Sequence, residues 1–389
     1  MRVLHIVSSM NPESGGVSQA IKTLIEETSK LDVISHLAVV DSPDALYLQN
    51  EPLIIYALGP SKGVWQYSKL LLPWLIENLI NYEVVIVHGL WLYHSYSVLK
   101  ASKLVERSNH SRPKIYIMPH GMLDPWFQEA QGRKLKAIRN WLYWKIIEKR
   151  VVNELDGLLF TCETEMLLAQ DTFSGYKPKM KKVVGLGIEA PPVFTKRMSD
   201  LFYNKCEGLK NENYILFLGR IHVKKGVDLL VNAYLALEAL GTKLPKLVIA
   251  GPGLETDYGK KIQALASKSN SIYLPGMLNG EIKWGAFYCC EAFILPSHQE
   301  NFGIAVAESL ACSKPVLISN QVNIWREIEV GQGGIIFSDS LEGTQTALEQ
   351  WFSLSLNQKK VMGLQAKAVY ESKFAVDSTV RRFMEAISV

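Results

Sequence analysis

The 389-residue chain lacks several short motifs that mark common enzyme chemistries. It contains no Asp-x-Asp pair, no HExxH element and no Walker A sequence. We therefore predict no divalent metal held by carboxylates and no P-loop nucleotide site. The chain also has no GxSxG element, the usual signature of serine acyl transfer. The sequence predicts neither a metal ion nor another resident cofactor.

Cysteines are few, and long uninterrupted apolar runs are missing. The five cysteines are an odd number without CxxC spacing, which argues against a disulfide framework and a zinc ribbon and favours a reducing cytosol. The apolar start Val3–Val7 is too short for a signal-peptide core. The most apolar stretch, Leu70–Ile80, is interrupted by Pro73, Glu77 and Asn78. We therefore expect no membrane-spanning segment and a cytoplasmic location.

An excess of one charge is also missing. There are 42 Lys and Arg residues against 38 Asp and Glu, giving a net charge of +4, which is too balanced for a surface that binds nucleic acid. Hydrophobic residues make up 48% and charged residues 21%, so a disordered or fibrous chain is excluded. The length predicts about two domains.

The chain alternates short apolar runs with longer amphipathic stretches, the pattern of parallel strands covered by helices. The opening run Val3–Val7 precedes a loop that ends at Gly16 and a stretch with helical spacing. The further runs predicted as strands are Leu37–Val40, Val84–Val87, Ile115–Met118, Gly157–Phe160, Tyr214–Leu218, Leu247–Ala250, Ser271–Leu274, Ala292–Leu295 and Pro315–Ile318. The sequence therefore predicts the α/β class.

The alternation fails between Ala190 and Asn213, where two prolines and a polar stretch occur. We therefore predict a first Rossmann-like domain over 1–195, a linker over 196–212 and a second Rossmann-like domain over 213–370. Residues 371–389 are expected to form a helix that returns to the first domain. Because ligands of open parallel sheets lie beyond the carboxyl ends of the strands, the loops that follow the strands are the candidate binding segments.

The clearest motif runs from Leu295 to Glu308. Its apolar start predicts a buried strand ending at Pro296, then a loop with Glu300 and a helix that begins at Gly303. The free amides of a helix start attract phosphate, and Glu308 can accept hydrogen bonds from two sugar hydroxyls. The motif indicates a nucleotide-sugar site, although each glutamate taken alone fits a solvated surface.

A second motif, Gly219–Gly226, follows the predicted strand Tyr214–Leu218. Arg220 and Lys225 are cations at a strand end that suit a diphosphate whose negative charge grows as a bond to it breaks. A solvated turn is the alternative interpretation of these lysines and arginines.

Three further segments follow strands in the first half. Gly15 and Gly16 precede the first helix and allow backbone amides to approach an anionic or carbohydrate ligand, although an ordinary strand-to-helix turn fits them as well. His120 follows a strand and is expected to place an imidazole beside a sugar, with Asp124 to orient it, and a buried structural histidine is the alternative. Trp91 offers a flat apolar face to an acceptor sugar, and core packing is its alternative.

The segment 132–150 carries seven Lys or Arg residues against one Glu, with Trp141, Tyr143 and Trp144 interleaved. This pattern is typical of a helix that lies on an anionic membrane surface, which gives the protein a predicted peripheral contact with the membrane. A solvated amphipathic helix packed on the first domain fits the pattern equally well.

Taken together, these elements resemble the retaining glycosyltransferases of the GT-B fold, specifically the large family 4 group. The resemblance covers nearly the whole chain. The family's E-x7-E element is similar to Glu300 through Glu308, and its Arg/Lys pair resembles Arg220 and Lys225. The stretch from His120 to Trp126 further resembles members that build bacterial exopolysaccharide or envelope polysaccharide.

The resemblance implies two facing Rossmann-like domains with the ligand cleft between them. It implies transfer of a hexose, with glucose as first expectation, from a UDP-sugar to a saccharide or lipid-linked saccharide, with retention and without a metal. The catalytic residues it implies are His120, Arg220, Lys225 and Glu300. The donor-binding residues are Gly15, Gly16, Gly276, Met277, Asn301, Phe302, Gly303, Ile304 and Glu308, with Trp91 and Asp124 on the acceptor side.

Two competing functions remain open. A nucleotide-sugar epimerase or a phosphorylase with the GT-B fold would act on the same kind of ligand. A catalytically silent nucleotide-sugar-binding partner in polysaccharide assembly belongs to another class, and the complete set Glu300, Arg220 and Lys225 argues against it.

Overall fold

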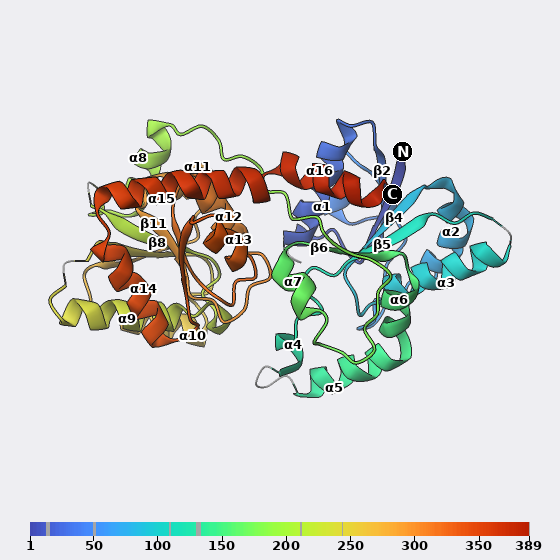
Figure 1. The fold of residues 1–389 in the computed structure, drawn as a ribbon, viewed down its shortest axis with the longest axis horizontal. Helices are drawn as coiled ribbons and strands as arrows, with labels where there is room; N and C mark the ends of the chain where they lie inside the picture. Colours follow the sequence, from blue (N-terminus) through green and yellow to red (C-terminus); the bar gives the residue numbers. More distant parts are fainter. Residues whose placement is uncertain are drawn as a thin grey trace. The chain divides into compact units, whose positions relative to one another are not determined.

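The structure is a computed structural model that describes residues 1–12, 16–49, 52–108, 110–129, 134–210, 212–242 and 244–388. The chain forms two compact units, one comprising Met1–Gly187 and Val376–Val389 and the other Ile188–Ala375. Each unit contains one parallel β-sheet flanked by helices (Figure 1). The predicted α/β class is therefore confirmed.

The sheet of the first unit has seven strands in the order β3-β2-β1-β4-β5-β6-β7. Their bounds are β1 Arg2–Val7, β2 Ile34–Val39, β3 Ile54–Ala57, β4 Val84–His88, β5 Lys114–Met118, β6 Gly157–Phe160 and β7 Lys181–Val183. The central strands are apolar on both faces because helices cover them, and β4 is buried along its whole length.

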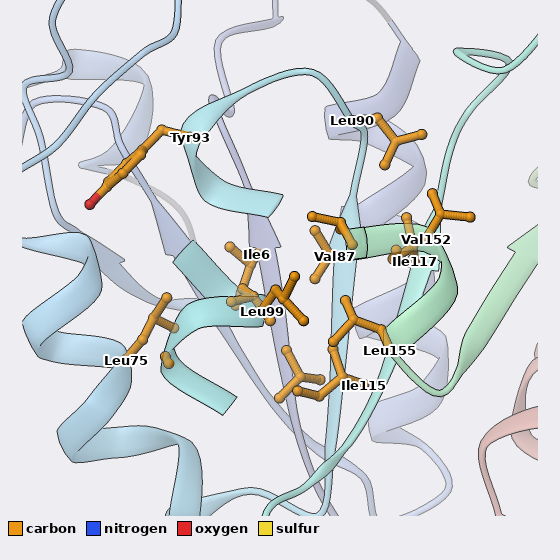
Figure 2. Packing of buried hydrophobic residues seen from close by; sticks show 14 of the residues in the cluster. Ile6, Leu75, Val87, Leu90, Tyr93, Leu99, Ile115, Ile117, Val152 and Leu155 are labelled. Carbon is orange, nitrogen blue, oxygen red and sulfur yellow. The ribbon is translucent and has the colours of Figure 1, made fainter. Parts of the chain in front are cut away.

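The helices of the first unit connect these strands. They are α1 Gly16–Ser29, η2 Leu46–Leu48, α2 Leu71–Asn78, η3 Leu79–Asn81, α3 Tyr93–Arg107, α4 Trp126–Glu129, α5 Lys134–Tyr143, the π-helical turn η4 Trp144–Glu148, α6 Lys149–Glu154, α7 Glu163–Leu168 and α16 Val376–Ile387. Figure 2 shows one core layer, in which Ile6, Val87 and Ile117 of the sheet pack with Leu99 of α3 and Val152 of α6.

The last helix, α16, is an integral part of the first unit. Its Phe383 and Ile387 are buried in one cluster with Val3 of β1 and Val84 of β4. The Arg382 guanidinium donates a hydrogen bond to the Val184 carbonyl at 3.2 Å. The first unit is thus built from two segments that lie far apart in the chain.

The sheet of the second unit has six strands in the order β10-β9-β8-β11-β12-β13. Their bounds are β8 Tyr214–Leu218, β9 Lys246–Ala250, β10 Ile272–Gly276, β11 Ala292–Leu295, β12 Val316–Ser319 and β13 Gly334–Phe337. The helices are α8 Lys196–Lys205, η5 Val223–Lys225, α9 Val227–Ala239, α10 Asp257–Ala266, α11 Gly280–Cys289, α12 Ile304–Ala311, α13 Trp325–Val330, α14 Leu341–Ser353, α15 Leu356–Val369 and η6 Tyr370–Phe374.

The segment 196–212, predicted as a linker, instead contributes a helix to the second unit. Helix α8 buries Met198 and Phe202 and packs against α11. Gly285 of α11 makes this approach possible, because a Cβ added there would lie 2.1 Å from the Met198 carbonyl oxygen. The helix escaped prediction because its buried apolar residues are few and most of its other positions are polar.

The strand order reverses once in each sheet, between β1 and β4 in the first unit and between β8 and β11 in the second. Loops that leave two neighbouring strands in opposite directions open a crevice at such a point, and ligands of open α/β sheets bind there. Among the described residues, no helix combines the length and the apolar character that crossing a membrane requires.

Candidate functional site

The site of the second unit begins where the loops after β8 and β11 meet. The Ser297 hydroxyl and the His298 amide both donate hydrogen bonds to the Lys224 carbonyl, at 3.0 and 2.9 Å. Gly226, at φ +61°, lies so close to the other loop that a Cβ there would be 2.0 Å from the Pro296 carbonyl oxygen. A glycine is therefore required to bring the two loops together.

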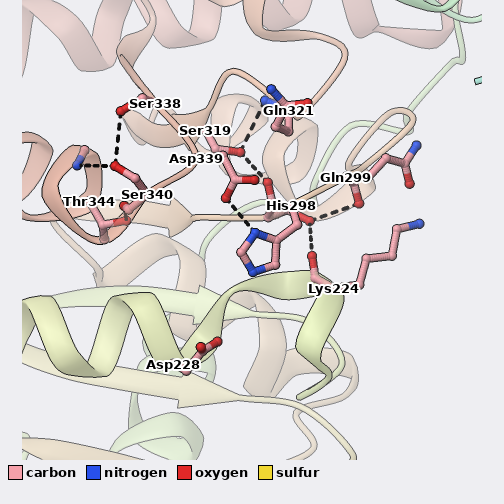
Figure 3. Close-up of polar contacts among 12 residues, drawn as sticks. Lys224, Asp228, His298, Gln299, Ser319, Gln321, Ser338, Asp339, Ser340 and Thr344 are labelled. Carbon is pink, nitrogen blue, oxygen red and sulfur yellow. Dashed lines mark hydrogen bonds and ion pairs between the residues drawn. The ribbon is translucent and has the colours of Figure 1, made fainter. Parts of the chain in front are cut away.

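The loop after β12 fastens the same segment from the other side. The Glu300 amide donates to the Gln321 carbonyl at 3.0 Å, and the Asn323 amide donates to the Glu300 carbonyl at 2.9 Å. Figure 3 shows the neighbouring contacts, in which the Ser319 hydroxyl donates to the Ser297 carbonyl and His298 contacts Asp339. The backbone that carries Glu300 is thus held by the ends of three adjacent strands.

The His298–Asp339 contact is an ion pair that strengthens this frame. The His298 Nδ1 atom lies 2.7 Å from an Asp339 carboxylate oxygen. The hydrogen bond that His298 donates to Asp339 raises the pKa of His298, and this effect outweighs the opposing effect of burial. No local pattern predicted this pair, because Asp339 lies 41 residues after His298.

Three of the predicted catalytic residues come together at this point. The Lys225 ammonium forms an ion pair with the Glu300 carboxylate, and both side chains are largely buried. Burial raises the pKa of Glu300, but the positive charges of Lys225, Lys224 and Arg220 outweigh it and leave the pKa below its ordinary value. Glu300 is therefore ionised at neutral pH in a field of three cations.

Helix α12 begins directly beyond this cluster. Gly303 precedes it at φ +81°, and Phe302 is buried against Phe374, with ring centroids 5.5 Å apart. Ile304 is the first helical residue, and the Asn301 side chain accepts a hydrogen bond from Asn323 at 3.5 Å. The loop is thus anchored by its aromatic ring, and the first amides of the helix form a site of positive potential.

Glu308 lies in the second turn of α12 and has a partner that sequence reasoning missed. The Lys283 ammonium donates a hydrogen bond to Glu308 Oε1 at 2.7 Å, and both side chains are mostly buried. Lys283 also lies over the Trp284 ring, 4.2 Å from its centroid. Lys283 comes from α11, a helix outside every motif of the sequence, so no local pattern marked it.

Gly276, the last residue of β10, and Met277 directly after it lie at the same carboxyl end of the sheet. The Gly251 amide donates to the Gly276 carbonyl at 2.8 Å, and the Gly219 amide donates to the Ala250 carbonyl at 3.0 Å. These bonds link the ends of β8, β9 and β10 into one continuous strip. The Met277 side chain is 60% exposed and available to a ligand.

In the first unit, His120 lies at the end of β5 and is one of three histidines in a row. His120 Nε2 is 3.0 Å from His88 Nδ1, and His88 Nε2 is 3.0 Å from His5 Nδ1. Burial lowers the pKa of His120 to about 4, so its ring is neutral at pH 7. His120 lines a small pocket with His88, Met118 and Gly185.

The remaining predicted residues of the first unit have packing roles. Asp124 accepts a hydrogen bond from the Trp126 amide at 2.9 Å, and His120 Nε2 contacts His88 Nδ1 at 3.0 Å. The orientation of His120 by Asp124 stays a prediction. Trp91 packs its ring on Phe173 and donates from Nε1 to the Met122 carbonyl at 3.2 Å. Core packing, the alternative interpretation, accounts for these Trp91 contacts.

The glycine loop is only partly described. Gly16 is the first residue of α1, whereas Gly15 lies outside the described residues. No cluster of three or more His, Cys, Asp or Glu side chains suited to a metal occurs within the described ranges. Independence from a metal remains a prediction.

Comparison with known proteins gives the class of the fold. Over the whole chain, the structure superposes on the crystal structure of Anabaena HepE in complex with UDP with a TM-score of 0.75, at 14% identity and full coverage of both chains. A glycosyltransferase from Rickettsia africae gives the same TM-score at 16% identity, covering 100% of this chain and 97% of that one. The fold is GT-B.

Residues 203–368 match the family described as glycosyl transferases group 1. An uncharacterised glycosyltransferase of Methanocaldococcus jannaschii is 30% identical over 54% of this chain. The GDP-mannose:cellobiosyl-diphosphopolyprenol alpha-mannosyltransferase of Xanthomonas campestris is 21% identical over 96% of this chain and 90% of its own length. The chain spans 60% of the Methanocaldococcus protein and 44% and 54% of two D-inositol 3-phosphate glycosyltransferases.

Proposed function

We propose that this protein is a retaining glycosyltransferase that moves a hexose, with glucose as first candidate, from a UDP-sugar to a saccharide or lipid-linked saccharide in polysaccharide biosynthesis. The observation that carries the proposal is the cluster of Lys225, Glu300 and Arg220 at the switch point between β8 and β11, directly before the start of α12. Positive side chains and free amides at one sheet edge suit a diphosphate. The fold and the family support the same function.

Each residue of the cluster has a proposed task. Lys225 and Arg220 neutralise the diphosphate as it leaves, and the amides after Phe302 bind one phosphate. Glu300 binds hydroxyls of the transferred sugar, and Glu308, oriented by Lys283, binds the ribose. The base stacks near Gly276 and Met277. Because two lysines and an arginine supply the positive charge, no metal is required in this proposal.

The proposed reaction retains the configuration of the sugar. The bond from the anomeric carbon to the diphosphate oxygen breaks, and a bond to the acceptor oxygen forms on the same face. The acceptor proton passes to the departing diphosphate oxygen. Glu300 is held beside Lys225 and serves binding, so no enzyme carboxylate acts as nucleophile.

The test removes one cation at a time. Arg220→Ala and Lys225→Ala are each expected to lower turnover about 10²–10³-fold, the usual cost of losing one preorganised donor to a developing negative charge. Lys260→Ala, an exposed lysine of α10 in the same unit, is the matched control and should retain full turnover. Turnover is measured as UDP release from UDP-glucose with polyprenyl-diphosphate-linked saccharides. Normal turnover in both cluster variants would contradict the proposal.

The same assay separates the competing functions. UDP that appears only with an acceptor supports transfer, whereas conversion of UDP-glucose to another nucleotide sugar without acceptor indicates an epimerase. Binding without turnover over the whole panel indicates a silent binding partner. GDP-mannose is included as second donor, because one relative is a GDP-mannose-dependent enzyme. A chelator that abolishes turnover would contradict the proposed independence from metal.

We further propose that the reaction takes place at the cytoplasmic face of a membrane, with helix α5 as the contact. Leu135, Ile138, Leu142 and Ile146 recur at helical spacing and are 85, 58, 47 and 67% exposed. Trp141 is exposed as well, whereas Trp144 is buried and stacks on Phe173. The predicted aromatic face is therefore replaced by a mainly aliphatic one.

Exposed cations flank this apolar face, namely Lys134, Lys136, Arg139, Lys145, Lys149 and Arg150. Apolar side chains beside cations complement an anionic bilayer, and each cation near such a surface contributes about 1 kcal/mol. Replacing Lys134, Lys136 and Arg139 by Ala should weaken binding to phosphatidylglycerol vesicles about 100-fold in a pelleting assay. The same change at Lys260, Lys261 and Lys268 is the control, and equal binding by the two triple variants would refute this contact.

A further inference from the structure

A row of three histidines crosses the centre of the first sheet. His5 belongs to β1, His88 ends β4, and His120 follows β5, so three adjacent strands each contribute one ring. The rings follow one another edge to edge in nearly parallel planes, with centroids 5.3 Å apart in both pairs and interplanar angles of 16° and 20°. His5 and His88 are 1% and 3% exposed, so the row leads from the buried core to His120, which lies beyond the carboxyl end of β5.

The two 3.0 Å nitrogen-to-nitrogen contacts in this row couple the protonation states of the rings. Each contact needs one N–H and one lone pair, and a neutral imidazole has one of each. Burial lowers the pKa of all three rings, which keeps them neutral at pH 7. The row therefore has two arrangements, in which all three rings carry the proton on Nδ1 or all three carry it on Nε2.

The buried end of the row distinguishes the two arrangements. His5 Nε2 is buried and has no hydrogen-bond partner among the described residues. If the protons were on Nε2, this atom would be a buried N–H without an acceptor, which is rare and unfavourable in folded proteins. If the protons are on Nδ1, His5 Nε2 instead carries a lone pair without a donor, and no N–H of the row is left without an acceptor inside the core. His94 adds no competing bond, because its Nε2 contacts the His88 carbonyl.

We propose that His5 and His88 are positioning residues that fix the proton of His120 on Nδ1 and so present this ring to the ligand as a neutral hydrogen-bond donor. The inference rests on the proposed function and deepens it, because the atoms that such a donor fits are the hydroxyl or ring oxygens of a sugar. With Nε2 occupied by the His88 proton, His120 binds and orients the substrate and does not remove a proton from it.

The closing experiment reads the tautomers in the full-length, ligand-free chain at pH 7.5. Long-range proton–nitrogen correlation spectra of histidine-labelled protein distinguish protonated from unprotonated ring nitrogens. The expected result is a single neutral tautomer of His120 with Nδ1 protonated, and the same tautomer for His88. A proton on Nε2 of His120, a mixture of tautomers or a charged ring would overturn the proposal. The measurement needs no sugar or nucleotide. A wrong tautomer therefore contradicts this inference alone, whereas the turnover assay tests the proposed transfer separately.

Two variants at one position then test whether His88 sets the tautomer. His88→Leu removes the donor and should shift most of the His120 population to Nε2–H, the form that free imidazole side chains favour. His88→Asn keeps an N–H near the place of Nδ1 and should preserve the Nδ1–H form. His36→Leu is the matched control, because His36 is buried in the same unit but contacts Tyr82 instead of the row. An unchanged His120 tautomer in His88→Leu would overturn the role of His88.

Discussion

Lowering the pH from 7.5 to 5.5 should destabilise the first unit through its buried histidines. Burial lowers the pKa of His5 to about 3 and the pKa values of His94 and His120 to about 4. The unfolded chain takes up protons near its ordinary value of about 6.5, so between these values it binds more protons than the folded chain. The stability that these residues provide is therefore complete above pH 6.5 and is lost progressively as the pH falls toward 4.

The magnitude follows from proton linkage. At pH 5.5 each of the three histidines costs the folded state about 1.4 kcal/mol, or about 4 kcal/mol together. Glu148 opposes them, because burial raises its pKa to about 7 in the folded state. Protonation of Glu148 between pH 7.5 and pH 5.5 stabilises the folded state by about 2 kcal/mol. The histidines outweigh the glutamate, and because the lowered pKa of His88 adds to the loss, the expected net loss is at least about 2 kcal/mol out of the 5–15 kcal/mol typical of a domain.

The second unit should respond in the opposite direction. The folded pKa of His298 is raised, chiefly by its hydrogen bond with Asp339, so this pair stabilises the unit fully below pH 6.5 and the gain is lost as the pH rises through the folded pKa. Because both side chains are partly exposed, the gain is small. Acid should therefore weaken the first unit without weakening the second.

Urea unfolding followed by pulse hydrogen exchange measures the two units separately, through peptides from β4 and β11. At pH 5.5 the β4 midpoint should fall below its value at pH 7.5, while the β11 midpoint holds. Glu148→Gln removes the opposing titration, so the free energy of unfolding that this variant loses between pH 7.5 and 5.5 should rise to about 4 kcal/mol. An unchanged or higher β4 midpoint in acid, or a variant that loses no more stability than the wild type, would refute the reasoning.

Three further substitutions test contacts of the second unit. Gly226→Ala adds a Cβ 2.0 Å from the Pro296 carbonyl oxygen and should lower turnover about 100-fold, because it separates the loops after β8 and β11. Unchanged UDP release would show that turnover does not depend on the close contact of these loops. Lys283→Met leaves Glu308 without its partner and should weaken UDP binding about tenfold in isothermal titration, with Lys260→Met as control; equal affinities would remove Lys283 from the site. Gly285→Val forces α8 away from α11 and should lower the urea stability of the second unit by about 1–3 kcal/mol, and a midpoint equal to that of the wild type would contradict the packing described.

The central strands of both sheets were predictable because burial on both faces makes them continuous apolar runs. The strands that escaped prediction are β3, β7 and β13, and each lies at an edge of its sheet. The strand β7 has the sequence Lys-Lys-Val and is partly exposed, so it carries no such run. The strands β3 and β13 are apolar but only four residues long, and they were missed despite their composition. The helix α8 was missed for a related reason, because only Met198 and Phe202 of its residues are buried.

The residues of the candidate site likewise fall into those that the sequence predicts and those that it does not. Glu300, Gly303 and Glu308 stand in one contiguous motif whose order along the chain already implies a strand, a loop and a helix. Lys283 and the row of histidines were not predictable, because their contacts join residues 25 to 83 positions apart. Only the pairing of the strands, which places β1, β4 and β5 side by side, brings the three rings together.

The two-part construction of the first unit sets the order of events while the protein is being made. Its core includes Phe383 and Ile387, which leave the ribosome only after the whole of 188–375 has been synthesised. At about 5–20 residues per second, that interval lasts roughly 10–40 s. During it, the cluster around Val3 and Val84 lacks its final helix. A nascent chain of this protein thus carries an unfinished amino-terminal unit for as long as its second unit is being made.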